Sequence, residues 1–224
     1  VVSEETLSNK VTAIVDGTRR KRTMANHTAT HLLHAALRNL VSDDIFQSGS
    51  LVSPDRLRFD FSYEKPLTEA QLREIEDWVN EQIREGHRVV EHQEVDRDYA
   101  VDELGAMAIF GEKYGETVRV IEIPGESVEL CGGTHVDTTE DINLFRINRE
   151  TSVAAGIRRV EALTRDEAYE AYRNDRQLLE EVADILDADR NDLKARLRAV
   201  IDDKDEAQRQ LDKLSQKLAD SEAK

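Results

Sequence analysis

The chain has 224 residues, of which 39% are hydrophobic, 35% charged and 5% aromatic, and its formal net charge at pH 7 is −16. That charge disfavours nonspecific attachment to polyanions, so contact with nucleic acid depends on local basic patches. A single cysteine excludes an intrachain disulfide framework, and the lack of long apolar runs argues against a membrane span or signal peptide, so we expect a cytoplasmic protein.

The first 63 residues pass from polar sequence into one helix and one strand pattern. Residues 1–22 contain a short apolar alternation, a turn signal at Asp16-Gly17 and a basic run over Arg19–Arg22, which together predict strand ends and a loop. Asn26 is expected to cap a helix whose apolar spacing continues to Val41. Alternation of apolar and polar residues over 57–61 then predicts a strand.

The next hundred residues alternate between strand and helix patterns. Thr68 is expected to begin a helix with one apolar face over 69–85, which Gly86 ends. Further strands are predicted over residues 89–95, 118–123, 144–147 and 157–162, with a short helix at 99–108 and a glycine-marked loop at 110–115. These elements predict an α+β domain with a mostly antiparallel sheet and packed helices.

Beyond Arg165 the composition changes, because neither glycine nor proline occurs there. Helical patterns over 166–186 and from Leu193 onward are separated by an interruption at 187–191. The second pattern has a seam with a period of about 3.5 residues, as in a coiled coil. The seam consists of Leu193, Leu197, Val200, Lys204, Ala207, Leu211, Leu214 and Leu218. A helix packed on the domain is one alternative, but the polar remaining faces favour a protruding helical hairpin or a coiled coil.

Two short-range pairs of metal-binding side chains stand out. His27 and His31 lie four residues apart in a predicted helix, which places both imidazoles on one face. Cys131 and His135 form a second pair, and the two glycines between them allow the backbone to bend so that thiolate and imidazole converge. Each pair alone is more often structural or exposed than metal-binding, whereas the two together predict one bound ion.

The donor types favour zinc, because mixed imidazole and thiolate ligands suit Zn²⁺ better than magnesium or calcium. Residue 28 is threonine, so the helical pair lacks the glutamate of the metalloprotease motif. His34 is a rival ligand, since it follows His31 by three residues on the same helical face.

Longer stretches around these pairs are similar to the editing domain of alanyl-tRNA synthetase. The resemblance is carried by residues 26–34, 47–52, 56–61, 105–108, 110–115, 131–135 and 154–159, and it is dense over about 11–164. It implies a remnant of a preceding β subdomain and linker over 1–22, a zinc-containing editing domain over 23–164, and helices over 165–224 that lead to a C-terminal module. Related editing domains occur in threonyl-tRNA synthetases and in free-standing editing proteins.

The resemblance implies an ester hydrolase that acts on alanine-specific tRNA, tRNA(Ala), mischarged with serine or glycine, and it implies no ligase activity for this stretch. His27, His31, Cys131 and His135 match the family's zinc ligands. Gln47 matches a polar residue of the editing pocket, and Arg158 matches a basic residue near the site. Alternatives are a free-standing editing protein and a noncatalytic, zinc-stabilised tRNA-binding module.

Three questions stay open at the level of sequence. Four protein ligands are typical of a closed structural zinc site, whereas catalytic zinc keeps one position open, so zinc either activates water or only positions the substrate. Arg158 and Arg159 are neighbours on a predicted strand, so at most one of them faces the site. The helices after Arg165 either pair with each other or form a homodimer.

Overall fold

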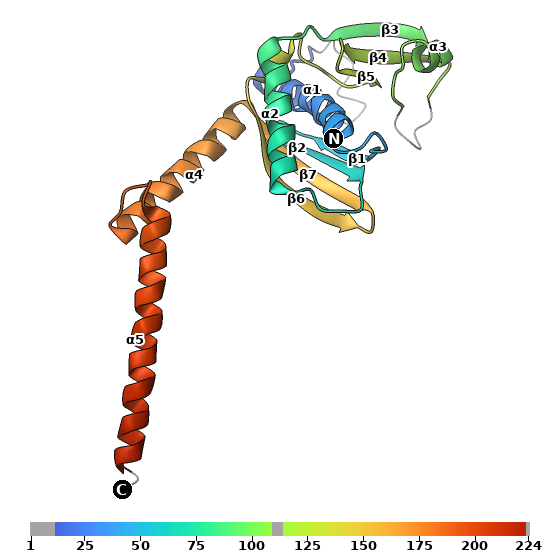
Figure 1. Cartoon of the computed structure of the whole chain (residues 1–224). Helices are drawn as coiled ribbons and strands as arrows, with labels where there is room; N and C mark the ends of the chain where they lie inside the picture. Colours follow the sequence, from blue (N-terminus) through green and yellow to red (C-terminus); the bar gives the residue numbers. More distant parts are fainter. Residues whose placement is uncertain (1–11, 109–113, 223–224) are drawn as a thin grey trace, which may run out of the picture. The chain divides into compact units, whose positions relative to one another are not determined.

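The computed structural model describes residues 12–108 and 114–222. The chain divides into two compact units, the first extending to Tyr169 and the second beginning at Glu170. Strands and helices are mixed in the first unit and the second is helical, so the predicted α+β class is confirmed (Figure 1). None of the described helices combines the length and apolar character that a membrane crossing requires.

A four-stranded antiparallel sheet forms the main framework of the first unit. Its strands, in spatial order, are β1 (Gln47–Val52), β2 (Leu57–Ser62), β7 (Ile157–Thr164) and β6 (Phe145–Ala154). The central pairing joins β2 to β7, so that Phe59 lies opposite Val160 although a hundred residues separate them. Both side chains are fully buried, which anchors the hydrophobic core on one face of the sheet.

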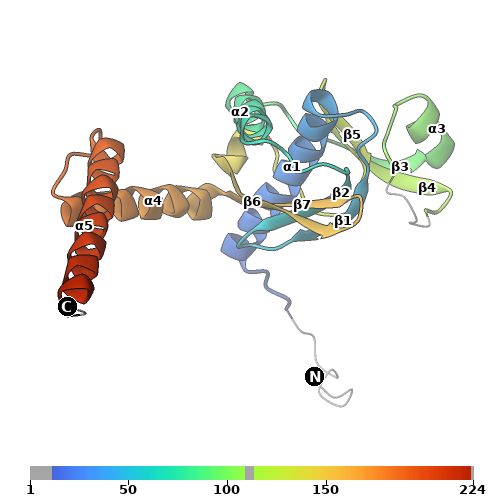
Figure 2. The ribbon, with the colours of Figure 1, turned by 60° about the horizontal axis from the view of Figure 1, so that its bottom comes forward.

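Helix α1 (Gly17–Leu40) is the central element of the unit. It contacts strands of the main sheet and also β5 of a second sheet (Figure 2). Between Ala25 and Leu37 every residue of α1 except His27 is buried, as expected for a helix covered on several sides. Helix α2 (Glu69–Glu85) packs beside α1, begins with a capping box at Thr68 and ends at Gly86 in the left-handed conformation, as predicted.

The second sheet has three antiparallel strands, β3 (Val90–Asp96), β4 (Thr117–Ile123) and β5 (Ser127–Leu130). Helix α3 (Arg97–Asp102) packs against β3 and β4, and a small separate core lies beneath it. The segment that follows β5 returns toward α1 and then enters the short 3₁₀ helix η2 (Thr139–Ile142).

The predicted loop over residues 16–22 is wrong, because α1 begins at Gly17. The side chain of Asp16 accepts a hydrogen bond from the backbone N–H of Arg19 and so caps the helix. Asn26, the predicted cap, lies inside the helix and is buried; its Nδ2 donates to the carbonyl of Ser53. Residues 12–15 form no strand, and residues 1–11 lie outside the described part.

Three further boundaries differ from the prediction. The short helix expected over 99–108 spans only Arg97–Asp102, and Gly105, with a φ of 68°, lies in a conformation that interrupts helices. Strand β6 is longer than predicted, because it pairs with β7 up to Ala154. Strand β5 was not predicted as a separate element. Most of the predicted glycine-marked loop, residues 110–113, lies outside the described residues.

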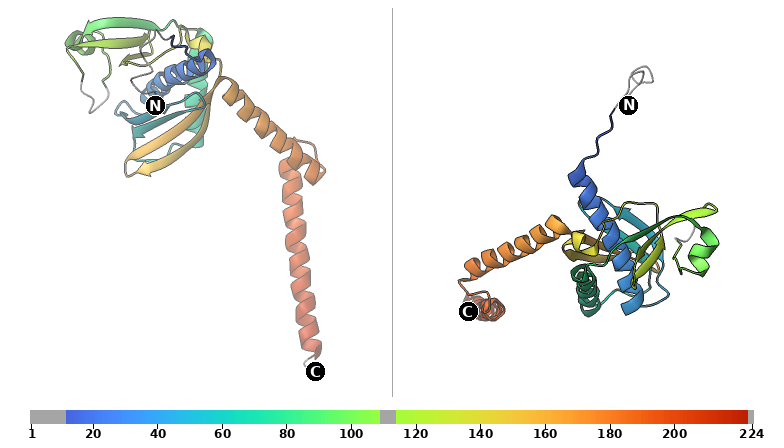
Figure 3. Two further views of the ribbon diagram at one scale, coloured as in Figure 1. Left: turned by 180° about the vertical axis from the view of Figure 1, so that it is seen from behind. Right: turned by 90° about the horizontal axis from the view of Figure 1, so that it is seen from above.

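The second unit contains the end of α4 (Arg165–Leu186) and all of α5 (Leu193–Glu222) (Figure 3). Both helices occur where the sequence predicts them. From Leu197 onward the larger apolar residues of the α5 seam are between 40% and 62% exposed, among them Val200, Leu211 and Leu218. The described residues therefore leave the seam uncovered, and homodimerisation through it stays a prediction.

Candidate metal centre

Helix α1 presents the first pair of donors. The imidazoles of His27 and His31 project from successive turns, with ring centroids 5.3 Å apart. His31 is buried, whereas His27 is half-buried. The packed helix therefore fixes the backbone positions from which both rings project.

The second pair lies on the segment after β5, which the chain holds against α1 with side-chain contacts. Arg119 of β4 donates to the backbone carbonyls of Cys131 and Gly133, at 2.9 and 2.6 Å. The hydroxyl of Thr28 lies 3.1 Å from Nδ1 of His135 and accepts from the N–H of Val136 at 3.2 Å. The Thr28 contacts join segments more than a hundred residues apart and direct the second pair toward the first, whereas the Arg119 contacts hold the same segment to β4.

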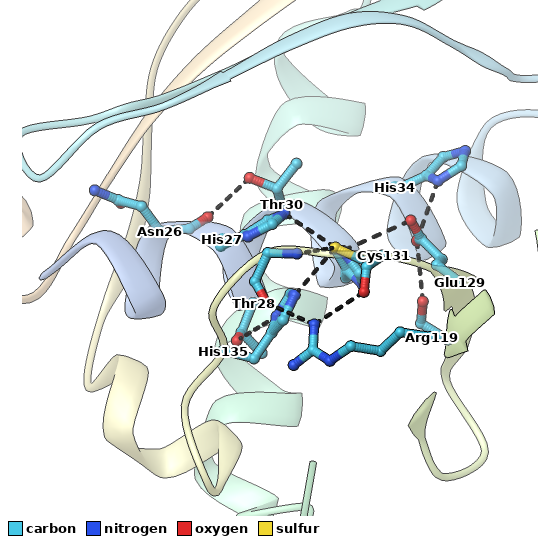
Figure 4. Close-up of polar contacts among 12 residues, drawn as sticks. Asn26, His27, Thr28, Thr30, His34, Arg119, Glu129, Cys131 and His135 are labelled. Atoms are coloured by element: carbon cyan, nitrogen blue, oxygen red, sulfur yellow. Dashed lines mark hydrogen bonds and ion pairs between the residues drawn. The ribbon is translucent and has the colours of Figure 1, made fainter. Parts of the chain in front are cut away.

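The four predicted ligands, His27, His31, Cys131 and His135, converge in the structure. Figure 4 labels three of them, His27, Cys131 and His135. One donor atom from each lies within 4.8 Å of the donor atoms of the others. The sulfur of Cys131 is 3.5 Å from Nε2 of His27 and 3.3 Å from Nε2 of His135. A tetrahedral zinc ion separates its ligand atoms by about 3.3–3.7 Å, so these spacings fit zinc.

The protonation of the imidazoles also suits a metal. Burial, with a smaller contribution from His31, lowers the pKa of His27 to about 4, and burial lowers the pKa values of His31 and His135 as well. Neutral imidazoles are the form that binds metal ions. Nδ1 of His31 is buried and, within the described part of the chain, has no hydrogen-bond partner. An ion ligated by that nitrogen would satisfy it.

Glu129 is a buried carboxylate beside this group that the sequence analysis missed. Its Oε2 lies 3.8 Å from Nε2 of His31, its Oε1 lies 3.3 Å from Nδ1 of His34, and Ser127 donates to it at 3.0 Å. Burial alone would raise the pKa of Glu129, but these neighbours outweigh burial and lower it to about 2. A carboxylate facing the second nitrogen of a ligating imidazole orients the ring and strengthens its basicity.

Replacing Glu129 with glutamine keeps the size of the side chain and removes its charge. We expect zinc affinity to fall about 10- to 100-fold, the usual effect of losing such an outer partner. Competition with a chromophoric chelator measures the change. Glu116, an exposed residue just before β4, supplies the control Glu116→Gln, which should bind zinc like the wild type. Equal affinities for the two variants would contradict the role assigned to Glu129.

The glycine pair between Cys131 and His135 has two unequal members. A Cβ at Gly133 would lie 2.1 Å from Cε1 of His27, whereas a Cβ at Gly132 would meet nothing within 4 Å. We expect Gly133→Ala to displace the His27 ring and weaken zinc binding at least ~10-fold, and Gly132→Ala to leave it unchanged. Zinc titration of both proteins checks this, and similar affinities would show that His27 does not need the space.

The other predicted site residues lie in different surroundings. Gln47 lines a cavity of about 210 Å³ together with His34 and Glu129. Glu129 in turn faces the ligand His31, so this carboxylate links the cavity to the metal group. His34 is outside the ligand group and contacts Glu129 instead.

No contact of the described residues joins Arg158 to the four ligands; its guanidinium pairs with Glu150 of β6. Arg159 pairs with Asp60 at 2.7 Å. The catalytic roles of Gln47 and Arg158 stay predictions.

Three supporting residues were not predicted, namely Glu129, Thr28 and Arg119. Glu129 precedes the ligand Cys131 by two residues, and Thr28 directly follows the ligand His27. This closeness in sequence was the available signal for these two residues. Their partners lie 95 and 107 residues away, which no local pattern reveals.

Comparison with known proteins gives consistent matches. Residues 118–161 match the family described as threonyl and alanyl tRNA synthetase second additional domain. The chain is 46% identical over 205 residues to an alanine–tRNA ligase of Xanthomonas campestris pv. campestris (strain 8004), covering 92% of this chain and 23% of that protein. It is 50% identical over 188 residues to an alanine–tRNA ligase of Thermotoga maritima, covering 84% and 22% respectively. The chain thus spans about a quarter of the length of these relatives.

Proposed function

Since this chain is a homologue of one segment of alanine–tRNA ligase, we propose that it hydrolyses the aminoacyl ester of tRNA(Ala) mischarged with serine or glycine. The chemical need for such a reaction is clear. A pocket that accepts the methyl group of alanine cannot exclude glycine by size, and rejects serine only weakly for one added hydroxyl. A second site must therefore remove the wrong products, and in the cell this would take place in the cytoplasm.

The observation that carries the proposal is the position of the small Gln47 cavity beside the metal group. Glu129 lines this cavity and also faces the ligand His31. A space of about 210 Å³ suits a small amino acid better than a larger ligand, because drug-sized ligands occupy roughly 300–1,000 Å³. The cavity thus supports an aminoacyl group held near the metal group, with Glu129 between the cavity and the ligand His31.

The residues take different roles in this proposal. His27, His31, Cys131 and His135 hold Zn²⁺, which when bound polarises a carbonyl group and lowers the pKa of a coordinated water toward ~7. The side-chain amide of Gln47 hydrogen-bonds the aminoacyl group in its cavity. Arg158 is proposed from the resemblance as a basic residue near the site, and its pairing with Glu150 holds it on the β6–β7 hairpin.

The test is deacylation of purified seryl-, glycyl- and alanyl-tRNA(Ala) by the zinc-loaded chain. We expect the first two esters to be hydrolysed and the third to be spared. Gln47→Ala should slow the reaction about tenfold, the effect of one lost hydrogen bond. Gln177→Ala on α4, which removes an exposed amide that donates to Glu181, should not. Failure of the zinc-loaded chain to hydrolyse either mischarged ester would refute the proposal.

A second candidate is a noncatalytic, zinc-stabilised tRNA-binding module. The observation that favours it is the number of protein ligands, because four donors form the closed pattern of structural zinc. The same deacylation assay separates the candidates. A module of this kind would bind tRNA and unfold on chelation without hydrolysing any ester.

A further inference from the structure

The metal group borders a second, larger cavity whose role the proposed function leaves open. This groove has a volume of about 690 Å³ and includes His135, one of the four ligands, in its wall. Its lining includes the apolar side chains of Met24 and Ile121. Its volume lies within the range of sites for drug-sized ligands, about 300–1,000 Å³, and exceeds that of the Gln47 cavity threefold.

Three arginines from separate segments line the groove. Arg20 lies in the second turn of α1, and spacings of four, seven and eleven residues put it on the same helical face as Met24, His27 and His31. Arg88 precedes β3 and pairs through its backbone with Thr138, which follows the ligand segment. The groove is thus flanked by basic side chains on the helix and strand that frame the metal group.

The charges of the groove leave two cations available. Arg119 is paired with Glu91 at 2.7 Å and holds the Cys131 segment through its other contacts. Arg20 and Arg88 are exposed and form no ion pair with any described residue, and Asp137 is the remaining acid of the lining. Two unpaired arginines on a chain of net charge −16 make this groove a local site for a polyanion.

An aminoacyl ester of tRNA has two unequal ends that must lie on either side of the reacting carbonyl. The Gln47 cavity is too small for a nucleotide, and its lining balances the buried carboxylate of Glu129 with one arginine, Arg38. The larger groove has the volume for a nucleotide chain and two arginines in its lining without an ion-pair partner among the described residues, which suit the phosphates of such a chain.

We propose that this groove binds the single-stranded 3′ end of tRNA, with Arg20 and Arg88 contacting its phosphates. The inference rests on the proposed function for the identity of the RNA. It assigns the nucleotide end of the substrate to one side of the metal group and the amino acid to the other.

The experiment measures binding of fluorescently labelled, uncharged tRNA(Ala) to the zinc-loaded chain over a range of salt concentrations. Arg20→Glu/Arg88→Glu is expected to weaken binding at least ~10-fold and to flatten the slope of log affinity against log salt by roughly 1–2. The control Lys65→Glu/Arg73→Glu changes the net charge equally at exposed residues of other cavities, and should weaken binding much less. Zinc content verifies that all proteins are folded.

A second arm uses tRNA(Ala) trimmed of its single-stranded 3′ end. Trimming should lower wild-type affinity to that of the double variant, and the variant should show no further loss. Equal losses in the variant and its control, or wild-type affinity unaffected by trimming, would overturn the inference. Because binding requires no hydrolysis, absence of ester cleavage would refute only the proposed function.

Discussion

Replacing Cys131 with alanine is expected to abolish stoichiometric zinc binding and to slow hydrolysis of seryl-tRNA(Ala) by on the order of 10³-fold. The thiolate is the only sulfur donor and lies within 3.5 Å of two imidazole nitrogens, so its loss leaves three nitrogen donors. A metal ion that polarises a carbonyl group lowers the activation barrier by several kcal/mol, and each 1.36 kcal/mol changes the rate by a factor of ten. Metal analysis and single-turnover deacylation measure both effects.

His92→Ala is the matched control, because this histidine lies on β3 and contacts Glu122 at 2.7 Å outside the ligand group. It should retain one zinc ion and hydrolyse within twofold of the wild type. Cys131→Ala should also melt at the temperature of chelated wild-type protein, which separates loss of the ion from wider misfolding. Deacylation by Cys131→Ala at the wild-type rate would exclude a catalytic role for the metal.

Removal of zinc is expected to make the stability of the chain strongly dependent on pH. In the metal-free protein the pKa of His27 is about 4, lowered mainly by burial, whereas an unfolded histidine titrates near 6.5. The unfolded state therefore binds more protons, and stability present above pH 6.5 falls as the pH drops toward 4. His27 alone accounts for about 3 kcal/mol of unfolding free energy; His31 and His135 act in the same direction.

Urea titrations of the chelated protein at pH 7.5, 6.5, 5.5 and 4.5 measure this loss. Glu129 adds a second range of pH-dependent stability at lower pH. Its contribution to the free energy of unfolding is present above its unfolded pKa of 4.5 and disappears as the pH falls toward 2. Zinc-loaded protein is the control, and its stability should persist to lower pH since the ion must first be displaced by protons. A urea midpoint of the metal-free protein that is constant from pH 7.5 to 4.5 would show that these histidines are not held in the neutral form by burial.

The convergence of four candidate ligands can be predicted from the sequence because the spacing within each pair is local. Four-residue separations define the His27–His31 and Cys131–His135 pairs without knowledge of the tertiary fold. Glu129 escapes the same reasoning, since its partner His34 is 95 residues away and a glutamate on a strand usually faces solvent. The sheet order is equally non-local, because the pairing of β2 with β7 depends on burial of Phe59 against Val160 and not on neighbouring residues.

The start of α1 shows how a local prediction fails. Asp16 and Asn26 are both good capping residues, and the arginine run between them is polar enough for a loop. Arginine and lysine are nevertheless favourable inside helices, so the basic run extends α1 by two turns. The correction matters for function, because only a helical Arg20 lies on the same face as His27 and His31.

The long interval between the two ligand pairs also sets the order of events during synthesis. His27 and Cys131 are separated by 104 residues, and ribosomes add roughly 5–20 residues each second. The two imidazoles of α1 are therefore made some 5–20 seconds before the second pair of donors, which His135 completes. If the group holds zinc as proposed, all four donors are available to the ion only after His135 has been made, so full coordination is a late event in the synthesis of the domain.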